Sequence, residues 1–140
     1  MSVHRGFHYY YTTISDQLTD IVKSNNNKII YITGHSLGAG VASIAAYELG
    51  IMDPTLDIRL TLFACPKSGN KSFRDSFKKT KVVSIVNYFD IVPESPEYIN
   101  KMFSIQPIYI FGTEEDSDVK NHSLDVYNNG IGMIELLNVN

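Results

Sequence analysis

The sequence lacks the features that would place it in a membrane, in a disulfide-bonded class or on nucleic acid. Its one cysteine, Cys65, excludes an internal disulfide. No stretch approaches the roughly 18 apolar residues of a membrane span, and residues 1–6 lack the apolar core of a signal peptide. The net charge is −3 without a block of Lys or Arg, which argues against nucleic acid as a partner. We therefore expect a cytoplasmic protein with no transmembrane segment.

Motifs for metals and phosphates are also missing. No cluster of His, Cys and Asp has the spacing of metal ligands, and no glycine-rich loop is suited to phosphate. We therefore expect neither a metal nor a cofactor. Cys65 ends an apolar run and precedes Pro66, so the sequence favours a small buried hydrophobe over a reactive thiol.

Helical and strand patterns alternate along the 140 residues. The spacing of apolar residues predicts helices over residues 7–24, 36–49 (ending at Gly50) and 70–79, with a short helix or turn over 122–129. Strands are expected at 28–33, 58–64 and 81–88, with one or two more within 103–111, where Pro107 argues against a central strand. Residues 114–116 are expected to form a solvated loop. The alternation indicates a single α/β domain over residues 1–140, with a mostly parallel sheet flanked by helices. Strand 28–33 is continuously apolar, as expected for a strand covered on both faces.

The most informative segment joins the first strand to the small-residue helix. It reads Gly34-His35-Ser36-Leu37-Gly38, the pattern of a nucleophile elbow. In such an elbow Ser36 stands on a strained turn, and Gly34 and Gly38 remove Cβ atoms that would collide with the neighbouring strand and helix. The backbone N–H of Leu37 would face the oxyanion of a tetrahedral intermediate. The alternative is a glycine-rich turn of another α/β protein.

A serine nucleophile needs a general base, and chain order selects it. In α/β hydrolases the acid and then the histidine follow the serine. Of the four histidines, only His122 comes after Ser36. His35 lies inside the elbow with its ring expected to point away from the Ser36 hydroxyl, which favours a packing role. His4 and His8 flank the first helix, where surface or supporting roles are expected.

The acid that orients the histidine is selected by position. Catalytic groups of a parallel sheet gather at the carboxyl ends of its strands. Asp90 directly follows the strand at 81–88 and is our candidate, although an ordinary turn aspartate near Pro93 is the competing interpretation. Asp116 and Asp118 stay as alternatives because they precede His122 closely. Three other aspartates are placed wrongly by their elements: Asp53, Asp57 and Asp75.

Five motifs in order make the chain resemble the class 3 lipases, the fungal triacylglycerol lipase-like branch of the α/β hydrolases. The matching segments are residues 3–7 (VHRGF), 33–39 (TGHSLGA), 63–70 (FACPKSGN), 87–93 (NYFDIVP) and 121–127 (NHSLDVY), the last similar to the family's H-x-x-Y segment. The resemblance implies a triad of Ser36, Asp90 and His122, and lipid esters as the substrate class.

The sequence departs from the family at its N-terminus. Family members have an upstream strand ending in F-R-G-T, which supplies a second oxyanion donor and leads into a lid, whereas only three residues precede His4 here. We therefore expect an N-terminally reduced domain with an exposed sheet edge or apolar groove. Loss of one oxyanion donor costs on the order of a hundred- to a thousandfold in rate.

These observations favour a serine carboxylester hydrolase acting on lipid, acylglycerol-type esters. One alternative is a reduced lipase-like protein with little turnover that binds lipid or a protein partner, and another is the C-terminal part of a longer lipase. Transient contact with a lipid surface fits the first two hypotheses. The run Tyr9-Tyr10-Tyr11 is a candidate for that contact, although a half-buried helix face is the favoured interpretation.

Overall fold

The computed structural model describes residues 1–96, 102–110 and 114–137, the last five of them by their backbone alone. Its centre is a parallel sheet in the order β1-β2-β3-β4, formed by β1 (Ile29–His35), β2 (Asp57–Phe63), β3 (Lys81–Asn87) and β4 (Pro107–Ile110). In this register His35 lies beside Phe63, and Phe63 lies beside Ile85. The strands therefore end close together, and the α/β class with a parallel sheet is confirmed.

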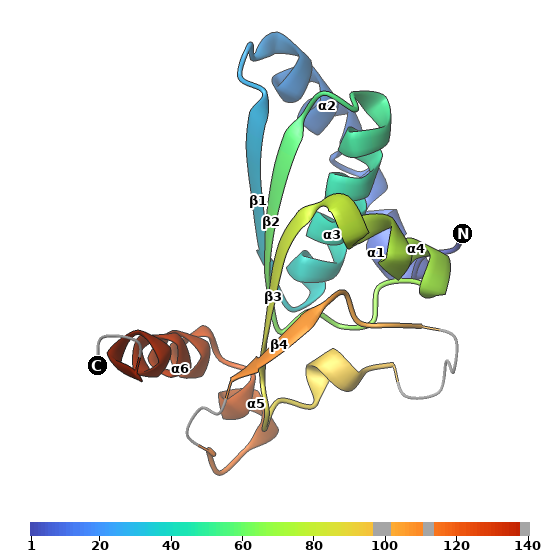
Figure 1. Cartoon of the computed structure of the whole chain (residues 1–140). Coiled ribbons are helices and arrows are strands. Elements are labelled where there is room, and N and C mark those ends of the chain that lie inside the picture. Colours follow the sequence, from blue (N-terminus) through green and yellow to red (C-terminus); the bar gives the residue numbers. More distant parts are fainter. Residues whose placement is uncertain (97–101, 111–113, 138–140) are drawn as a thin grey trace.

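Most of the helices lie on one face of this sheet. The helices are α1 (Arg5–Thr12), α2 (Ser15–Ser24), α3 (Leu37–Met52), α4 (Lys71–Ser76), α5 (Asp118–Asn121) and α6 (Leu124–Leu137), with 3₁₀ turns η1 (Phe77–Lys79) and η2 (Val92–Glu94). In Figure 1, α1, α3 and α4 lie on the same side of the sheet, whereas α6 projects from the opposite side near the carboxyl ends of the strands.

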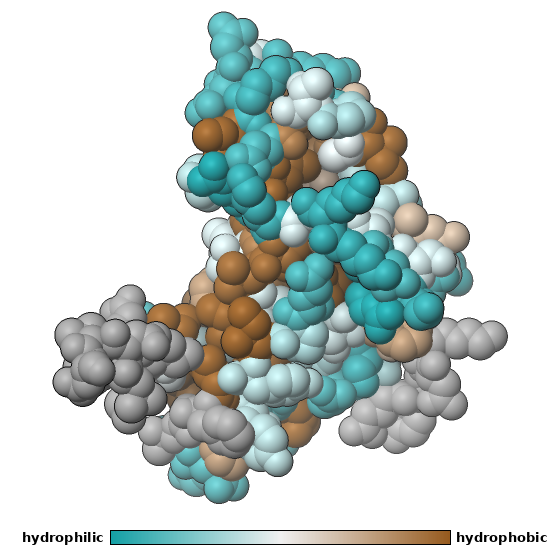
Figure 2. All heavy atoms as spheres, viewed as in Figure 1, coloured by the Kyte–Doolittle hydropathy of each residue, from teal (hydrophilic) through white to brown (hydrophobic). Residues whose placement is uncertain are grey.

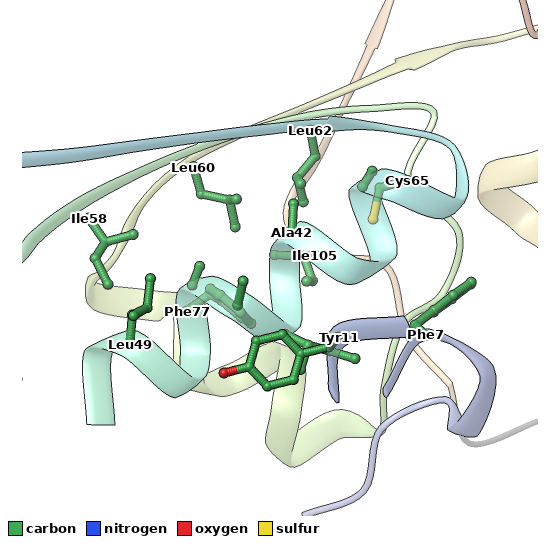
Figure 3. Close-up of a cluster of buried hydrophobic side chains, with 14 of the residues drawn as sticks. Phe7, Tyr11, Ala42, Leu49, Ile58, Leu60, Leu62, Cys65, Phe77 and Ile105 are labelled. Carbon is green, nitrogen blue, oxygen red and sulfur yellow. The ribbon is translucent and has the colours of Figure 1, made fainter. Parts of the chain in front are cut away.

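The larger of two clusters of buried apolar residues lies between α3 and the sheet, and the smaller one includes Tyr127 of α6. Small residues of α3 such as Ala42 and Ala46 let the helix approach the sheet, where Leu60 and Leu62 of β2 are fully buried against it (Figure 3). Gly40 does the same for α1, since a Cβ there would lie 2.7 Å from the ring of Phe7. The core therefore fixes the helix that begins at the elbow.

The helix predicted over residues 7–24 is two helices. The chain breaks at Thr13 and Ile14, whose N–H groups bond to carbonyls three residues back (Tyr10 and Tyr11), not four. The hydroxyls of Thr12 and Thr13 also bond to carbonyls of the preceding turn. Such local bonds compete with the helical pattern, and a pair of threonines is the sequence signal for them.

The expectation that the first strand is covered on both faces is wrong. β1 is an edge strand of the sheet, and the side chains that point away from α3 are open to solvent, with Tyr31 73% exposed. Val83 of β3 and Ile108 of β4 are exposed too. In Figure 2 apolar residues gather over the middle of the molecule. An apolar strand sequence thus marked membership of a parallel sheet rather than complete burial.

The remaining elements agree with the sequence more closely. α3 runs past Gly50 to Met52, because Gly50 keeps a negative φ and continues the helix instead of ending it. Pro107 opens β4 at the other edge of the sheet, and Phe111 of the predicted range lies outside the described residues. Residues 114–116 form neither helix nor strand. The short helix predicted at residues 122–129 is the longer α6.

The tyrosine run at residues 9–11 is partly exposed. Tyr9 and Tyr10 are exposed and Tyr11 is buried, so the run belongs half to the core and half to the surface around it.

Within the described part of the chain, no helix has both the length and the apolar character needed to span a bilayer.

Cys65 is buried, as its sequence context predicts, and burial raises the pKa of its thiol to about 12. At pH 8 only about one thiol in ten thousand would then be ionised. We expect Cys65 to react far more slowly with a thiol-specific chromogenic disulfide in the folded protein than in protein unfolded by denaturant. The rate of the absorbance change measures the reaction in both states. Equal rates in the two states would contradict the buried placement.

Candidate active site

Ser36 occupies a strained turn between β1 and α3. Its φ of 57° and ψ of −128° place a non-glycine residue in a region that side chains avoid. Three backbone hydrogen bonds hold the turn. Ser36 N–H donates to the Phe63 carbonyl at 3.0 Å, and the Ser36 carbonyl accepts from Ala39 N–H at 2.9 Å and from Gly40 N–H at 3.3 Å. The strained serine is thus fixed both to the neighbouring strand and to the helix that follows.

Of the two glycines that flank Ser36, only Gly34 lies so close to α3 that a side chain would collide with it. A Cβ at Gly34 would lie 2.5 Å from the Gly38 carbonyl oxygen and 2.8 Å from the Ala39 Cα, so the helix could not approach the strand. A Cβ at Gly38 would meet nothing within 4 Å. The expectation that both glycines prevent collisions is therefore correct for Gly34 and wrong for Gly38, because Gly38 faces outward from the first turn of α3.

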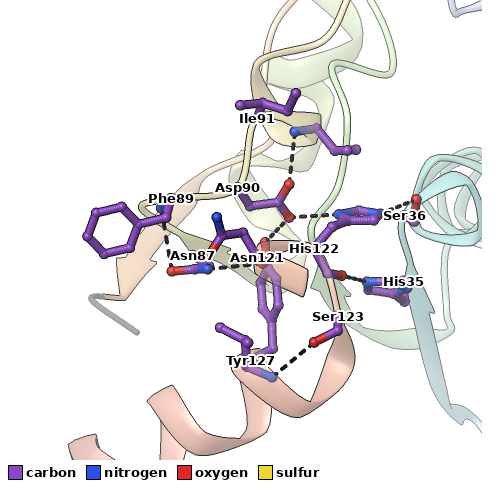
Figure 4. A network of polar contacts seen from close by, with 12 residues as sticks. His35, Ser36, Asn87, Phe89, Asp90, Ile91, Asn121, His122, Ser123 and Tyr127 are labelled. Carbon is purple, nitrogen blue, oxygen red and sulfur yellow. Dashed lines mark hydrogen bonds and ion pairs between the residues drawn. The ribbon is translucent and has the colours of Figure 1, made fainter. Parts of the chain in front are cut away.

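The structure brings Ser36, His122 and Asp90 into one chain of hydrogen bonds (Figure 4). Ser36 Oγ lies 2.7 Å from His122 Nε2, and His122 Nδ1 lies 2.8 Å from Asp90 Oδ2. Ser36 follows β1, Asp90 follows β3, and His122 lies between α5 and α6. Residues separated by as many as 86 positions therefore meet at the carboxyl edge of the sheet.

Asp90 accepts hydrogen bonds from three donors. Its side chain is 0% exposed, against 21% for His122. Besides His122, the Val92 N–H donates to Oδ1 at 2.9 Å and the Tyr127 hydroxyl donates to Oδ2 at 2.7 Å. Burial raises the pKa of Tyr127, and its bond to Asp90 acts in the same direction, so the hydroxyl keeps its proton and acts as a donor. This arrangement favours the tautomer in which His122 carries its proton on Nδ1 and presents a bare Nε2 to Ser36.

Leu37 stands where a donor for a developing oxyanion is needed. It is the first residue of α3, so its N–H has no acceptor within the helix. The helix is 16 residues long, and its dipole favours negative charge at this end. The backbone geometry thus allows the role that the sequence assigned to Leu37.

Three polar side chains around His122 support it; the sequence placed His35 in the elbow with a packing role, whereas Tyr127 and Asn87 were not identified as site residues. Tyr127 bonds to Asp90, His35 Nε2 lies 2.9 Å from the His122 carbonyl oxygen, and Asn87 Nδ2 donates to the Asn121 carbonyl at 3.0 Å. His35 thus does more than the packing predicted for it. A tyrosine in the histidine segment was a usable signal for Tyr127, although it stands five residues after His122 rather than three.

The alternative site residues lie elsewhere. Asp116 pairs with Lys120 at 2.8 Å, and Asp118 opens α5, so neither replaces Asp90 beside the His122 ring. His4 and His8 lie at the start of α1, within the part of the chain that packs on α3. In the described residues, no group of three or more His, Cys, Asp or Glu side chains is placed to hold a metal ion.

Two surface hollows lie at opposite ends of the sheet. One of about 460 Å³ is lined by residues near the amino ends of β2 and β3, including Asp57 and Lys81, and is remote from Ser36. A second of about 340 Å³ is lined by Phe63, Leu124 and Tyr127, next to the hydrogen-bonded chain. This second hollow, which Asp125 and Asn128 also line, therefore lies beside the polar site.

The two glycines of the elbow form a matched pair for a stability test. We expect Gly34→Ala to lower the free energy of unfolding by about 1–3 kcal/mol, because its methyl group would overlap backbone atoms of α3. Gly38→Ala should leave that energy within about 1 kcal/mol of the parent, because alanine is the better helix former and has room. Urea titration followed by circular dichroism measures both. Equal losses in the two variants would contradict the packing described here.

Comparison with known proteins agrees with this geometry. The family model for Lipase (class 3) matches residues 1–99. Phospholipase A1-IIdelta of Arabidopsis thaliana is 40% identical over 72 residues, which cover 48% of this chain and 18% of that protein. The triacylglyceride lipase of Rhizomucor miehei superposes with a TM-score of 0.68 and 25% identity, over 77% of this chain and 44% of its own.

A further solved structure is a triacylglycerol lipase whose catalytic centre is described as a serine protease triad. It is 26% identical, has a TM-score of 0.67, and is covered to 45% by this chain. The chain thus spans less than half the length of each of these relatives. Because the family model matches 99 of the 140 residues, from residue 1 to residue 99, the chain belongs to the class 3 lipase family.

Proposed function

We propose that this chain is a serine carboxylester hydrolase of lipid esters, with Ser36 as the nucleophile. The observation that carries the proposal is the unbroken hydrogen-bond chain from Ser36 Oγ through His122 to Asp90, at 2.7 and 2.8 Å. A serine on a strained elbow, a histidine base and a buried carboxylate together are the arrangement of acyl-transfer enzymes.

The first half of the reaction acylates the serine. Ser36 Oγ attacks the ester carbonyl carbon while His122 Nε2 takes the hydroxyl proton. The carbonyl oxygen becomes an oxyanion, and the Leu37 N–H at the start of α3 donates a hydrogen bond to it. Asp90 stabilises the imidazolium that forms. When the tetrahedral intermediate collapses, His122 gives the proton to the departing alcohol, and the acyl group stays on Ser36.

The second half returns the enzyme to its starting state. Water attacks the acyl carbon, His122 removes a proton from that water, and Ser36 leaves as the alcohol when the proton is returned to it. No group other than the ester, water and the side chains named above is needed to balance these steps.

Lipid esters are the proposed substrate class because of family membership and because of the surface around the site. The relatives named above are a phospholipase and triacylglycerol lipases. Leu37, Ile91 and Leu124 are all exposed, and each lies within two residues of Ser36, Asp90 or His122. Apolar side chains around a polar centre can enter a lipid surface and bring the ester bond to Ser36. Soluble short-chain esters would reach the same serine without that contact.

Replacing Ser36 tests the nucleophile. We expect Ser36→Ala to lower kcat on p-nitrophenyl butyrate by about 10⁴-fold or more, because no other group can form the acyl-enzyme. The same change should abolish labelling by a fluorophosphonate probe, which reports a nucleophilic serine even where turnover is slow. Ser24→Ala, at the exposed end of α2, is the matched control and should behave as the parent does. Equal hydrolysis and labelling by Ser36→Ala and the parent would refute the proposal.

A pair of exposed isoleucines tests contact with lipid. Ile91 follows Asp90 and is 56% exposed, whereas Ile51 is 57% exposed near the other end of α3, about 20 Å along the helix from Leu37. We expect Ile91→Ser to reduce hydrolysis of emulsified tributyrin several-fold while leaving hydrolysis of soluble ester unchanged. Ile51→Ser should change neither. Identical emulsion kinetics for the two variants would argue against docking at this surface.

A further inference from the structure

His122 stands on a short connection between two helices, and the N–H groups of this connection are bonded to α5. His122 N–H donates to the Asp118 carbonyl at 3.0 Å, and Ser123 N–H donates to the Lys120 carbonyl at 2.9 Å. His122 and Ser123 form the whole link between α5 and α6, and α5 has only four residues. Carbonyl groups at the end of a helix have no partner within the helix, so they need donors from elsewhere. The donors to the Asn121 and His122 carbonyls come from the sheet.

Two side chains from the sheet form hydrogen bonds with the peptide groups on either side of the His122 Cα. Asn87 Nδ2 donates to the Asn121 carbonyl at 3.0 Å, and His35 Nε2 lies 2.9 Å from the carbonyl oxygen of His122 itself. A carbonyl oxygen can only accept, so His35 is the donor and carries its proton on Nε2. Figure 4 draws both contacts, one on each side of His122.

Both donors, His35 and Asn87, stand at the end of a strand, where the sheet holds their backbone in place. His35 is the last residue of β1 and Asn87 is the last residue of β3. Asn87 is fully buried, and the His35 ring packs against the His122 ring with centroids 4.7 Å apart and a tilt of 33°. The Tyr127 ring packs edge-on against His35 at 6.2 Å. Side chains fixed at the ends of strands can therefore set the position of a loop residue accurately.

We infer that His35 is a positioning residue for His122: its Nε2–H, opposite the Asn87 amide, sets the backbone from which the imidazole reaches Ser36 and Asp90 together. The inference rests on the proposed roles of those three residues. Both bonds of the imidazole are short, and a displacement of about 1 Å can cost a hundredfold in rate. A purely structural hydrogen bond would change stability without changing the rate of the folded enzyme.

Two substitutions separate the hydrogen bond of His35 from its ring. His35→Gln keeps an N–H donor at a similar distance from Cα and loses the aromatic ring, whereas His35→Phe keeps a ring and loses the donor. For p-nitrophenyl butyrate we expect His35→Phe to lower kcat about ten- to a hundredfold with KM within twofold of the parent. His35→Gln should stay within about threefold in kcat. A folded His35→Phe with parental kcat, or a His35→Gln that loses as much as His35→Phe, would overturn the inference.

A spectroscopic measurement tests the same inference without relying on activity. In ¹⁵N-labelled parent protein we expect His35 in the Nε2–H tautomer with that proton protected from exchange, and His122 with a low-field Nδ1–H signal. The low-field signal should persist in His35→Gln and broaden or vanish in His35→Phe. His35 found as the Nδ1–H tautomer would overturn the inference even if His35→Phe fails to fold. If Ser36→Ala left hydrolysis intact, the proposed function would fail, while these ring signals would still decide the placement of His122.

Discussion

One imidazole has to bridge two strands that are not neighbours, and the rest of the site is built around that span. Ser36 follows β1 and Asp90 follows β3, with β2 between them, so their strands stand about 10 Å apart. A hydroxyl and a carboxylate cannot meet across that distance, but a histidine with hydrogen bonds at both ring nitrogens can join them. The parallel register brings the strand ends level, and the α5–α6 connection lowers His122 into the gap.

The strain at Ser36 is the second constraint, and the packing of α3 maintains it. The positive φ of Ser36 persists because the turn is bonded to β2 on one side and continues into a helix whose small residues are buried against the sheet. Gly34 contributes by the absence of a side chain, since the first turn of α3 passes within contact distance of it. The hydroxyl is thus held at the edge of the sheet by the core of the protein, and the site inherits the rigidity of that core.

The sequence was sufficient for the parts of the molecule that follow from local pattern and topology. Ser36 could be placed because strand, turn and helix are contiguous, and Asp90 because the end of a parallel strand is a topological position. His122 followed from chain order alone. The roles of His35 and Asn87 could not be predicted, because they depend on where the α5–α6 link passes in space. The outer face of β1 was misjudged for a related reason: composition tells that a strand is apolar, but not whether anything covers it.

Among the residues that the structure describes, β1 is the last strand on its side of the sheet. The strand is seven residues long and reads IIYITGH, with no lysine, glutamate or proline in it. Natural sheets use such residues to keep edge strands from pairing with other chains. Here a charged residue of this kind, Lys28, stands just before the strand. Unpaired backbone groups at a sheet edge can pair with a strand of another chain, so association through β1 would grow with protein concentration. Dilute solutions and a solubilising residue on the outer face, at Tyr31, are the natural conditions for keeping the chain monodisperse.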